Sequence, residues 1–137
     1  MTMQWSGGVA IVDDEEALTD LIAAMLDLKG ILVCFKAYDG REAMQKFREH
    51  NPKPEVVIMD YRLTSTNGIE VMKEMKQMYN GSMFIFLSAD SAVRDEALKA
   101  GAEMFLAKPS SMKDLIDAVE RVAGSQRKAA GNGPEAT

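Results

Sequence analysis

Four apolar segments of the chain each end in a residue whose side chain could take part in phosphoryl transfer. In chain order these residues are Asp13 with Asp14, Asp60, Ser88 and Lys108. Carboxylates gathered at one place repel one another, so a cation must offset their charge. Mg²⁺ prefers such hard oxygen ligands, and the ammonium group of Lys108 would neutralise more. With both cations drawing charge from the phosphoryl oxygens, a carboxylate could attack phosphorus as a nucleophile.

The apolar segments predict strands that are buried on both faces. Val56–Met59 is continuously apolar, follows two prolines and runs straight into Asp60, which is typical of a strand in a covered parallel sheet. Four further runs have the same character: Val9–Val12, Ile31–Phe35, Met83–Leu87 and Met104–Ala107. A segment with helical spacing of apolar residues follows each run, so strands alternate with amphipathic helices.

Five strands alternating with five helices predict an α/β fold, a doubly wound five-stranded parallel sheet with helices on both faces. Ligands bind outside the carboxyl ends of the strands in such sheets. Asp13, Asp60 and Lys108 are almost equally spaced, and each interval spans about two strand–helix units. All three are therefore expected at one edge of the sheet, with Asp60 as the reactive group.

Composition and charge exclude several classes of protein. The chain has 137 residues, which suits one domain with a real core. Its net charge of −5 argues against a general nucleic-acid or anionic-membrane binder. No stretch reaches the roughly 18 apolar residues of a membrane span, and Met1–Gly8 lacks the features of a secretory signal. Because the single Cys34 cannot form an internal disulfide, a cytoplasmic location is expected.

Helical periodicity sets the expected boundaries and the expected core. The predicted segments are a flexible N-terminal lead-in (1–7), a folded domain (8–123) and a flexible tail (124–137). Within the folded domain the spacing predicts that Leu21 and Met78 face the core. Asp14 is the expected N-cap of the first helix.

Taken together, the motifs resemble those of the receiver domain of two-component response regulators, in particular the small single-domain chemotaxis regulator. The resemblance covers about residues 8–123. It is carried by Val12-Asp13-Asp14, by Asp60 with Gly68 in the following loop, by Ser88-Ala89 and by Lys108-Pro109. It implies a flavodoxin-like fold with strand order 2-1-3-4-5, and a signalling protein that catalyses only its own phosphorylation and slow autodephosphorylation.

The resemblance implies a role for each site residue. Asp60 would accept a phosphoryl group from a phosphohistidine on a sensor histidine kinase or phosphotransfer protein. The Mg²⁺ ligands would be the carboxylates of Asp13, Asp14 and Asp60 and the backbone carbonyl of Arg62. Lys108 would bind the phosphoryl oxygens and Ser88 would donate a hydrogen bond to them. Phe105 would turn inward as the Ser88 hydroxyl moves, and the Lys108–Pro109 peptide bond would be cis.

Phosphorylation would then change the surface that meets a downstream target protein. That surface comprises the helix ending at Gly101, the strand Met104–Ala107 and the helix that begins near Ser110 or Ser111. The same face is a possible homodimer interface. No nucleic-acid contact and no membrane insertion is expected of this domain. Two conformations that differ by a few kcal/mol suffice for such a switch.

The sequence departs from the family pattern beside the phosphoacceptor. Thr64 stands where the family usually has proline, so the loop is expected to be looser. Arg62 and Asp90 flank the site at variable positions, and they either pair with each other or are merely solvated.

Two other functions remain open. The first is a Mg-dependent phosphohydrolase with an aspartyl nucleophile, which normally needs a second Asp where Arg62 stands. The second is a receiver-like scaffold without phosphorylation, which the complete set of site residues disfavours.

Overall fold

The centre of the molecule is a parallel sheet of five strands, each short and apolar. The computed structural model describes the backbone of residues 7–131 and the side chains of residues 7–124. The strands of this sheet are β1 (Val9–Val12), β2 (Val33–Ala37), β3 (Val56–Met59), β6 (Met83–Ser88) and β7 (Met104–Ala107). Their order is β2-β1-β3-β6-β7 and every neighbouring pair is parallel. Since β6 and β7 are the fourth and fifth strands of this sheet along the chain, the predicted fold class and the predicted strand order 2-1-3-4-5 are confirmed.

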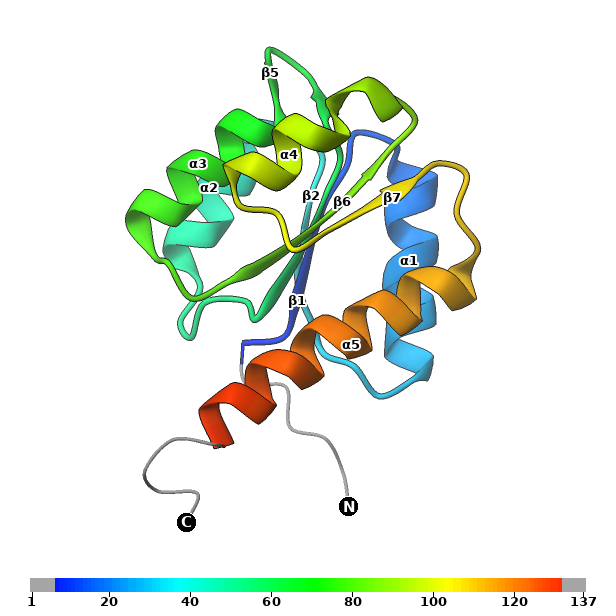
Figure 1. Ribbon diagram of the computed structural model, residues 1–137, viewed down its shortest axis with the longest axis vertical. Coiled ribbons are helices and arrows are strands. Elements are labelled where there is room, and N and C mark those ends of the chain that lie inside the picture. Colours follow the sequence, from blue (N-terminus) through cyan, green and yellow to red (C-terminus); the bar gives the residue numbers. More distant parts are fainter. Residues whose placement is uncertain (1–6, 132–137) are drawn as a thin grey trace.

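Five α-helices of the described chain cover both faces of the sheet. They are α1 (Glu16–Leu28), α2 (Gly40–Glu49), α3 (Gly68–Met78), α4 (Arg94–Ala100) and α5 (Met112–Gly131). Figure 1 shows α1 and α5 on one face and α2, α3 and α4 on the other. A 3₁₀ turn, η1 (Ser91–Val93), lies between β6 and α4. None of the described helices is long and apolar enough to cross a membrane.

Alternation along the strands divides the core into two layers. In β1, Val9 and Ile11 belong to the cluster under α1 and α5, while Ala10 and Val12 belong to the cluster under α2, α3 and α4. Successive side chains of a strand point to opposite faces. Because both faces are covered, every residue of β1 is buried, and the first polar residue after the strand reaches the sheet edge.

Side-chain caps set where two of the helices begin. The carboxylate of Asp39 accepts a hydrogen bond from the backbone N–H of Glu42 at 2.8 Å, at the start of α2. The side-chain oxygen of Asn67 accepts one from Glu70 at 3.0 Å, at the start of α3. Each cap satisfies a backbone donor that the helix itself leaves unpaired. At the other end of α4, Gly101 takes a left-handed conformation with φ 117°.

The loop after Asp60 is more ordered than the sequence predicted. A small antiparallel hairpin of β4 (Arg62–Leu63) and β5 (Thr66–Asn67) forms in this loop, which was expected to be loose. Its two-residue connection places Ser65 in the left-handed region, at φ 70°. The hairpin therefore closes directly over the segment that follows β3.

Three local expectations were wrong. Leu21 and Met78 are 50% and 41% exposed. Thr19, Ile22 and Leu26 take the inner face of α1, and Met78 is the last residue of α3, beyond its buried residues, which end with Met75. Asp14 does not cap α1: the N-cap position is Glu15, which makes no side-chain cap bond.

The predicted tail is partly helical. α5 continues to Gly131, past residue 123 where the folded domain was expected to end. Residues 125–130 include Gln, Arg, Lys and Ala and no proline, and such residues allow a packed helix to propagate. Residues 1–6 of the predicted lead-in and residues 132–137 of the predicted tail lie outside the described residues.

Candidate functional site

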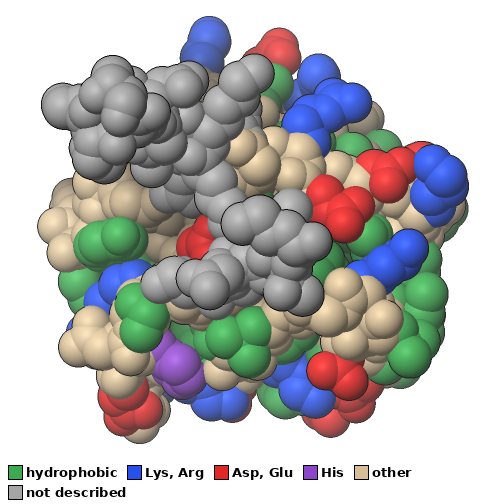
Figure 2. All heavy atoms as spheres, turned by 90° about the horizontal axis from the view of Figure 1, so that it is seen from below, with side chains coloured by type: hydrophobic (Ala, Val, Ile, Leu, Met, Phe, Trp, Pro, Cys, Tyr) green, Lys and Arg blue, Asp and Glu red, His purple; other side chains and the backbone are tan. Residues whose placement is uncertain are grey.

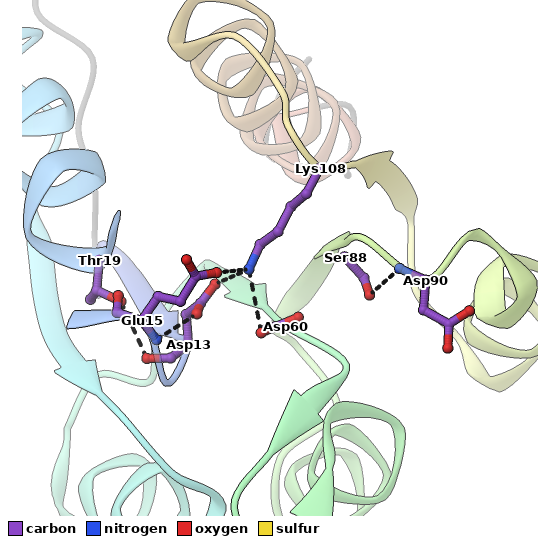
Figure 3. Close-up of polar contacts among 7 residues, drawn as sticks. All are labelled: Asp13, Glu15, Thr19, Asp60, Ser88, Asp90 and Lys108. Atoms are coloured by element: carbon purple, nitrogen blue, oxygen red, sulfur yellow. Dashed lines mark hydrogen bonds and ion pairs between the residues drawn. The ribbon is translucent and has the colours of Figure 1, made fainter. Parts of the chain in front are cut away.

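The polar residues that follow the strands meet at one edge of the sheet. Asp13 follows β1, Asp60 follows β3, Ser88 ends β6 and Lys108 follows β7. Backbone hydrogen bonds continue the ladder past the strands: the N–H of Asp60 donates to Val12 at 2.9 Å and that of Lys108 to Ser88 at 2.9 Å. The backbones that carry these side chains are therefore fixed by the sheet itself. Figure 3 shows the side chains converging from separate strands.

The ammonium group of Lys108 connects the carboxylates of this cluster. Its Nζ atom donates to Oδ2 of Asp13 at 2.9 Å, to Oε1 of Glu15 at 2.9 Å and to Oδ2 of Asp60 at 3.4 Å. The Asp13 and Asp60 side chains are only 3% and 6% exposed, while that of Glu15 is 61% exposed. One cation is thus shared by two buried carboxylates and one that faces solvent.

The first turn of α1 holds Asp13 in place. Oδ1 of Asp13 accepts a hydrogen bond from the backbone N–H of Glu15 at 2.9 Å. The fully buried Thr19 donates its hydroxyl to the carbonyls of Asp13, at 3.3 Å, and Glu15, at 3.0 Å. The other oxygen of Asp13, Oδ2, is the one that faces Lys108. Local hydrogen bonds therefore orient the carboxylate before any ligand is considered.

The pKa values of both central ionisable groups are raised, which favours the neutral form of Asp60 and the charged form of Lys108. Burial, and then the negative charge of Asp13, raise the pKa of Asp60 to about 6, although Lys108 and the backbone of Arg62 partly offset the change. Burial disfavours the charged form of Lys108, but hydrogen bonds to Glu15 and Asp13 outweigh it, so the pKa of Lys108 is raised. Lys108 therefore stays cationic at neutral pH, while Asp60 takes up a proton more readily than a free aspartate as the pH falls.

Three carboxylates are placed so that they could hold a metal ion. Asp13, Asp14 and Asp60 each offer an oxygen, and these atoms lie within 4.8 Å of one another. Asp14 is exposed and the other two are buried, so the set opens toward solvent on one side. Hard oxygen donors with excess negative charge fit Mg²⁺, which usually keeps several waters. The backbone carbonyl of Arg62 as a further ligand stays a prediction.

Gly68 allows α3 to begin directly against the phosphoacceptor segment. A Cβ atom on this residue would clash with the backbone carbonyl oxygen of Asp60. The N–H of Gly68 donates to the carbonyl of Tyr61 at 2.7 Å. A larger residue would therefore push the hairpin and the start of α3 away from Asp60.

The two predicted switch residues lie on neighbouring strands. Ser88 is 1% exposed, and its hydroxyl oxygen accepts a hydrogen bond from the N–H of Asp90 at 3.1 Å. Phe105 on β7 is half-buried against the core under α2, α3 and α4, in register with Phe86 of β6. The Lys108–Pro109 peptide bond is cis, as predicted.

The pairing of Arg62 with Asp90 is present. A guanidinium nitrogen of Arg62 lies 3.6 Å from the carboxylate of Asp90, and the Arg62 side chain is 77% exposed. The pair joins the loop after β3 to the loop after β6. Arg62 also stands at the position where a phosphohydrolase would carry its second acid. That position is therefore occupied by a cation, which is turned outward to Asp90.

Sequence reasoning missed Glu15 and Thr19 as parts of the site. Glu15 was not among the predicted site residues, although its place directly after Asp13-Asp14 could have indicated a third nearby carboxylate. Thr19 gave no signal, because a threonine inside a helical pattern rarely reports a hydrogen bond to the preceding loop.

Away from the site, Lys/Arg and Asp/Glu side chains are interspersed on the described part of the opposite end of the molecule (Figure 2).

Comparison with known proteins gives a consistent result. Residues 9–120 match the sequence model of the response regulator receiver domain. The chemotaxis protein CheY of Thermotoga maritima is 33% identical over 117 residues, which cover 84% of this chain and 96% of that protein.

Two solved structures extend the comparison to three dimensions. A CheY-like receiver domain protein from Methanospirillum hungatei superposes with a TM-score of 0.80 at 23% identity, over 88% of this chain and 96% of the other. The response regulator protein TrrA of Thermotoga maritima, solved in complex with Mg²⁺ and beryllium fluoride, superposes with a TM-score of 0.73 at 27% identity, over 83% and 96% of the two chains. The first likeness shows the fold alone.

Proposed function

Because the chain belongs to the response regulator receiver domain family, whose members are signalling proteins rather than classical enzymes, we propose that it is a phosphorylation-controlled switch of a two-component system. Asp60 accepts a phosphoryl group from a phosphohistidine on a sensor histidine kinase or phosphotransfer protein. The observation that carries this proposal is the sharing of one ammonium group, that of Lys108, between the buried carboxylates of Asp13 and Asp60.

The covalent step needs an ionised and accessible Asp60. A carboxylate oxygen of Asp60 forms a bond to phosphorus while the bond from phosphorus to the histidine nitrogen breaks. The electron pair of the broken bond stays on the imidazole, which takes up a proton from solvent. Ala89 is small and follows Ser88 directly, so the donor can approach along this side.

The remaining residues of the site manage charge. Asp13, Asp14 and Asp60 would hold Mg²⁺, with the Arg62 carbonyl as a further ligand, and the bound ion would neutralise charge on the phosphoryl oxygens. Lys108 turns its ammonium group to the phosphoryl oxygens, where charge accumulates. Ser88 exchanges its contact with the Asp90 N–H for a hydrogen bond that its hydroxyl donates to the phosphoryl group.

That exchange is the proposed link to the output surface. As the Ser88 hydroxyl moves, the half-buried Phe105 turns inward, and the face formed by α4, β7 and α5 changes. A downstream target protein reads this face, and a homodimer through the same face is a second possible output. The cytoplasmic location expected from the sequence remains a prediction, as does the absence of nucleic-acid contacts.

Incubation with acetyl phosphate and Mg²⁺ tests this proposal against its two rivals. A switch gains the mass of one phosphoryl group, and Asp60→Asn does not. A phosphohydrolase would instead turn over many equivalents of a phosphate ester, and a scaffold would do neither. The outward-turned Arg62 disfavours the hydrolase, which has no observation in its favour.

A further inference from the structure

Glu15 is a third carboxylate on the Lys108 ammonium group, and neither the metal set nor the phosphoacceptor role uses it. Its Oε1 atom lies 2.9 Å from Nζ of Lys108, as close as Oδ2 of Asp13 and closer than Oδ2 of Asp60 at 3.4 Å. The ammonium group is thus drawn toward the β1 side of the site and away from the phosphoacceptor, as Figure 3 shows.

We propose that Glu15 is a positioning residue that competes with Asp60 for the Lys108 ammonium group in the unmodified protein, withholds part of its hydrogen bonding from Asp60, and releases it when a phosphoryl group is present. The proposal rests on the proposed function of Asp60 and deepens it. The three N–H donors of Lys108 are already shared among Glu15, Asp13 and Asp60. Lys108 therefore cannot bind Glu15 and the phosphoryl oxygens with full strength at the same time. Because the Glu15–Lys108 contact stabilises only the unmodified protein, it opposes phosphorylation.

Glu15 has a backbone held by hydrogen bonds and an exposed side chain, and a residue that holds and then releases Lys108 needs both. Its backbone is held at both ends, because its N–H donates to Asp13 and its carbonyl accepts from the Thr19 hydroxyl. Its side chain is 61% exposed, so the carboxylate returns to water without a large desolvation change when Lys108 leaves. The backbone of Glu15 is therefore fixed in place, while its carboxylate can separate from Lys108.

The alternative explanation is that Glu15 merely favours the positive N-terminal end of α1. Glu16 provides the matched control, because it has the same charge and lies in the first turn of the same helix. The described contacts of the Lys108 ammonium group are to Asp13, Glu15 and Asp60. A helix-dipole effect would appear in both variants, whereas the proposed effect belongs to Glu15.

The first experiment observes the contact without any phosphoryl donor. The ¹⁵N signal of the Lys108 ammonium group, assigned through Lys108→Arg, is compared among the full-length wild type, Glu15→Gln, Glu15→Asp and Glu16→Gln. We expect Glu15→Gln and the shorter Glu15→Asp to shift this signal, and Glu16→Gln to leave it unchanged. An unshifted signal in Glu15→Gln would overturn the proposal whatever Asp60 does.

The second experiment measures the rate of phosphorylation by acetyl phosphate with saturating Mg²⁺. A partly exposed ion pair predicts a rate roughly two- to fivefold higher in Glu15→Gln than in Glu16→Gln. Glu15→Asp keeps the charge but not the reach, so its rate should rise toward that of Glu15→Gln. Thermal unfolding of each variant confirms that the fold is intact.

Failure of this inference can be told apart from failure of the proposed function. If the wild type gains no phosphoryl group, the function fails, and the ammonium signal still decides whether Glu15 holds Lys108. If the wild type is phosphorylated but Glu15→Gln matches Glu16→Gln, or is slower, the withholding role is refuted and the function stands.

Discussion

The ammonium nitrogen of Lys108 lies 3.4 Å from the carboxylate of Asp60, although the two residues are 48 positions apart in the chain. One follows β7, at the edge of the sheet, and the other follows β3, at its centre, with β6 between them. Both side chains are nearly buried, at 13% and 6% exposure. Each therefore depends on the other for its charge balance, and this dependence can be measured.

A double-mutant cycle measures the coupling between these two residues. Lys108→Met removes the cation but keeps a similar bulk, and leaves Asp13 and Asp60 uncompensated, so we expect a loss of about 1–3 kcal/mol of unfolding free energy at neutral pH. In the Asp60→Asn background the loss should be smaller, with a coupling of roughly 0.5–3 kcal/mol. Urea denaturation gives all four values, and additive effects would mean that the contact carries no energy.

Asp60→Asn alone should stabilise the unmodified protein at neutral pH. The folded-state pKa of Asp60, about 6, lies above the value of about 3.9 for a free aspartate. The folded protein therefore binds this proton more tightly, and ionisation of Asp60 lowers the unfolding free energy as the pH rises from about 4 to about 6. The stabilisation should reach about 1–3 kcal/mol above that range and disappear below it.

The control for this pH dependence is Glu16→Gln, which removes an exposed acid of the first turn of α1. Its stability difference should stay small across the same pH range. If Asp60→Asn proved less stable than the wild type at neutral pH, Asp60 would be favourably rather than unfavourably ionised in the fold.

Mg²⁺ should stabilise the wild type through Asp13, Asp14 and Asp60. A ligand that binds only the folded state adds about 1.4 kcal/mol at ten times its Kd. Asp14 is the exposed member of the set, so Asp14→Asn should keep the fold and lose most of the rise in melting temperature. Glu16→Gln should retain it, and EDTA should reverse it. An equal rise in wild type and Asp14→Asn would place the ion elsewhere.

Arg62→Ala should shorten the lifetime of the phosphoryl group more than it changes the fold. The Arg62–Asp90 pair spans the loops that flank the site, and its loss should open Asp60 to water. We expect a lifetime at least about threefold shorter, with a change in unfolding free energy within about 0.5 kcal/mol. Arg41→Ala, an exposed arginine on α2, is the control. A phosphate-release assay that gives the wild-type lifetime for Arg62→Ala would refute this role.

Much of the fold could be predicted because burial on both faces leaves a strong pattern. The continuous apolar runs around Val9 and Val56 mark covered strands, and the residue after each run must emerge at the sheet edge. Because the strands of the sheet are parallel, their carboxyl ends lie at one edge, and Asp13, Asp60 and Lys108 are brought together there. The placement of these three side chains follows from topology rather than from local sequence.

Other features depend on contacts that periodicity does not encode. The β4–β5 hairpin requires a backbone conformation at Ser65 that a run of small polar residues only permits. Whether Leu21 or Ile22 faces the sheet depends on how α1 is rotated, and one position changes the direction by about 100°. The contact of Glu15 with Lys108 depends on the reach of two long side chains from distant segments.

The position of the phosphoryl group tests the central claim most directly. After reaction with acetyl phosphate and Mg²⁺, borohydride reduces an acyl phosphate to an alcohol, which peptide mass spectrometry can locate. We predict one modified residue, Asp60, in the wild type, and no modified residue in Asp60→Asn. Modification at Asp13 or Asp14 instead, or an unmodified wild type, would contradict the account.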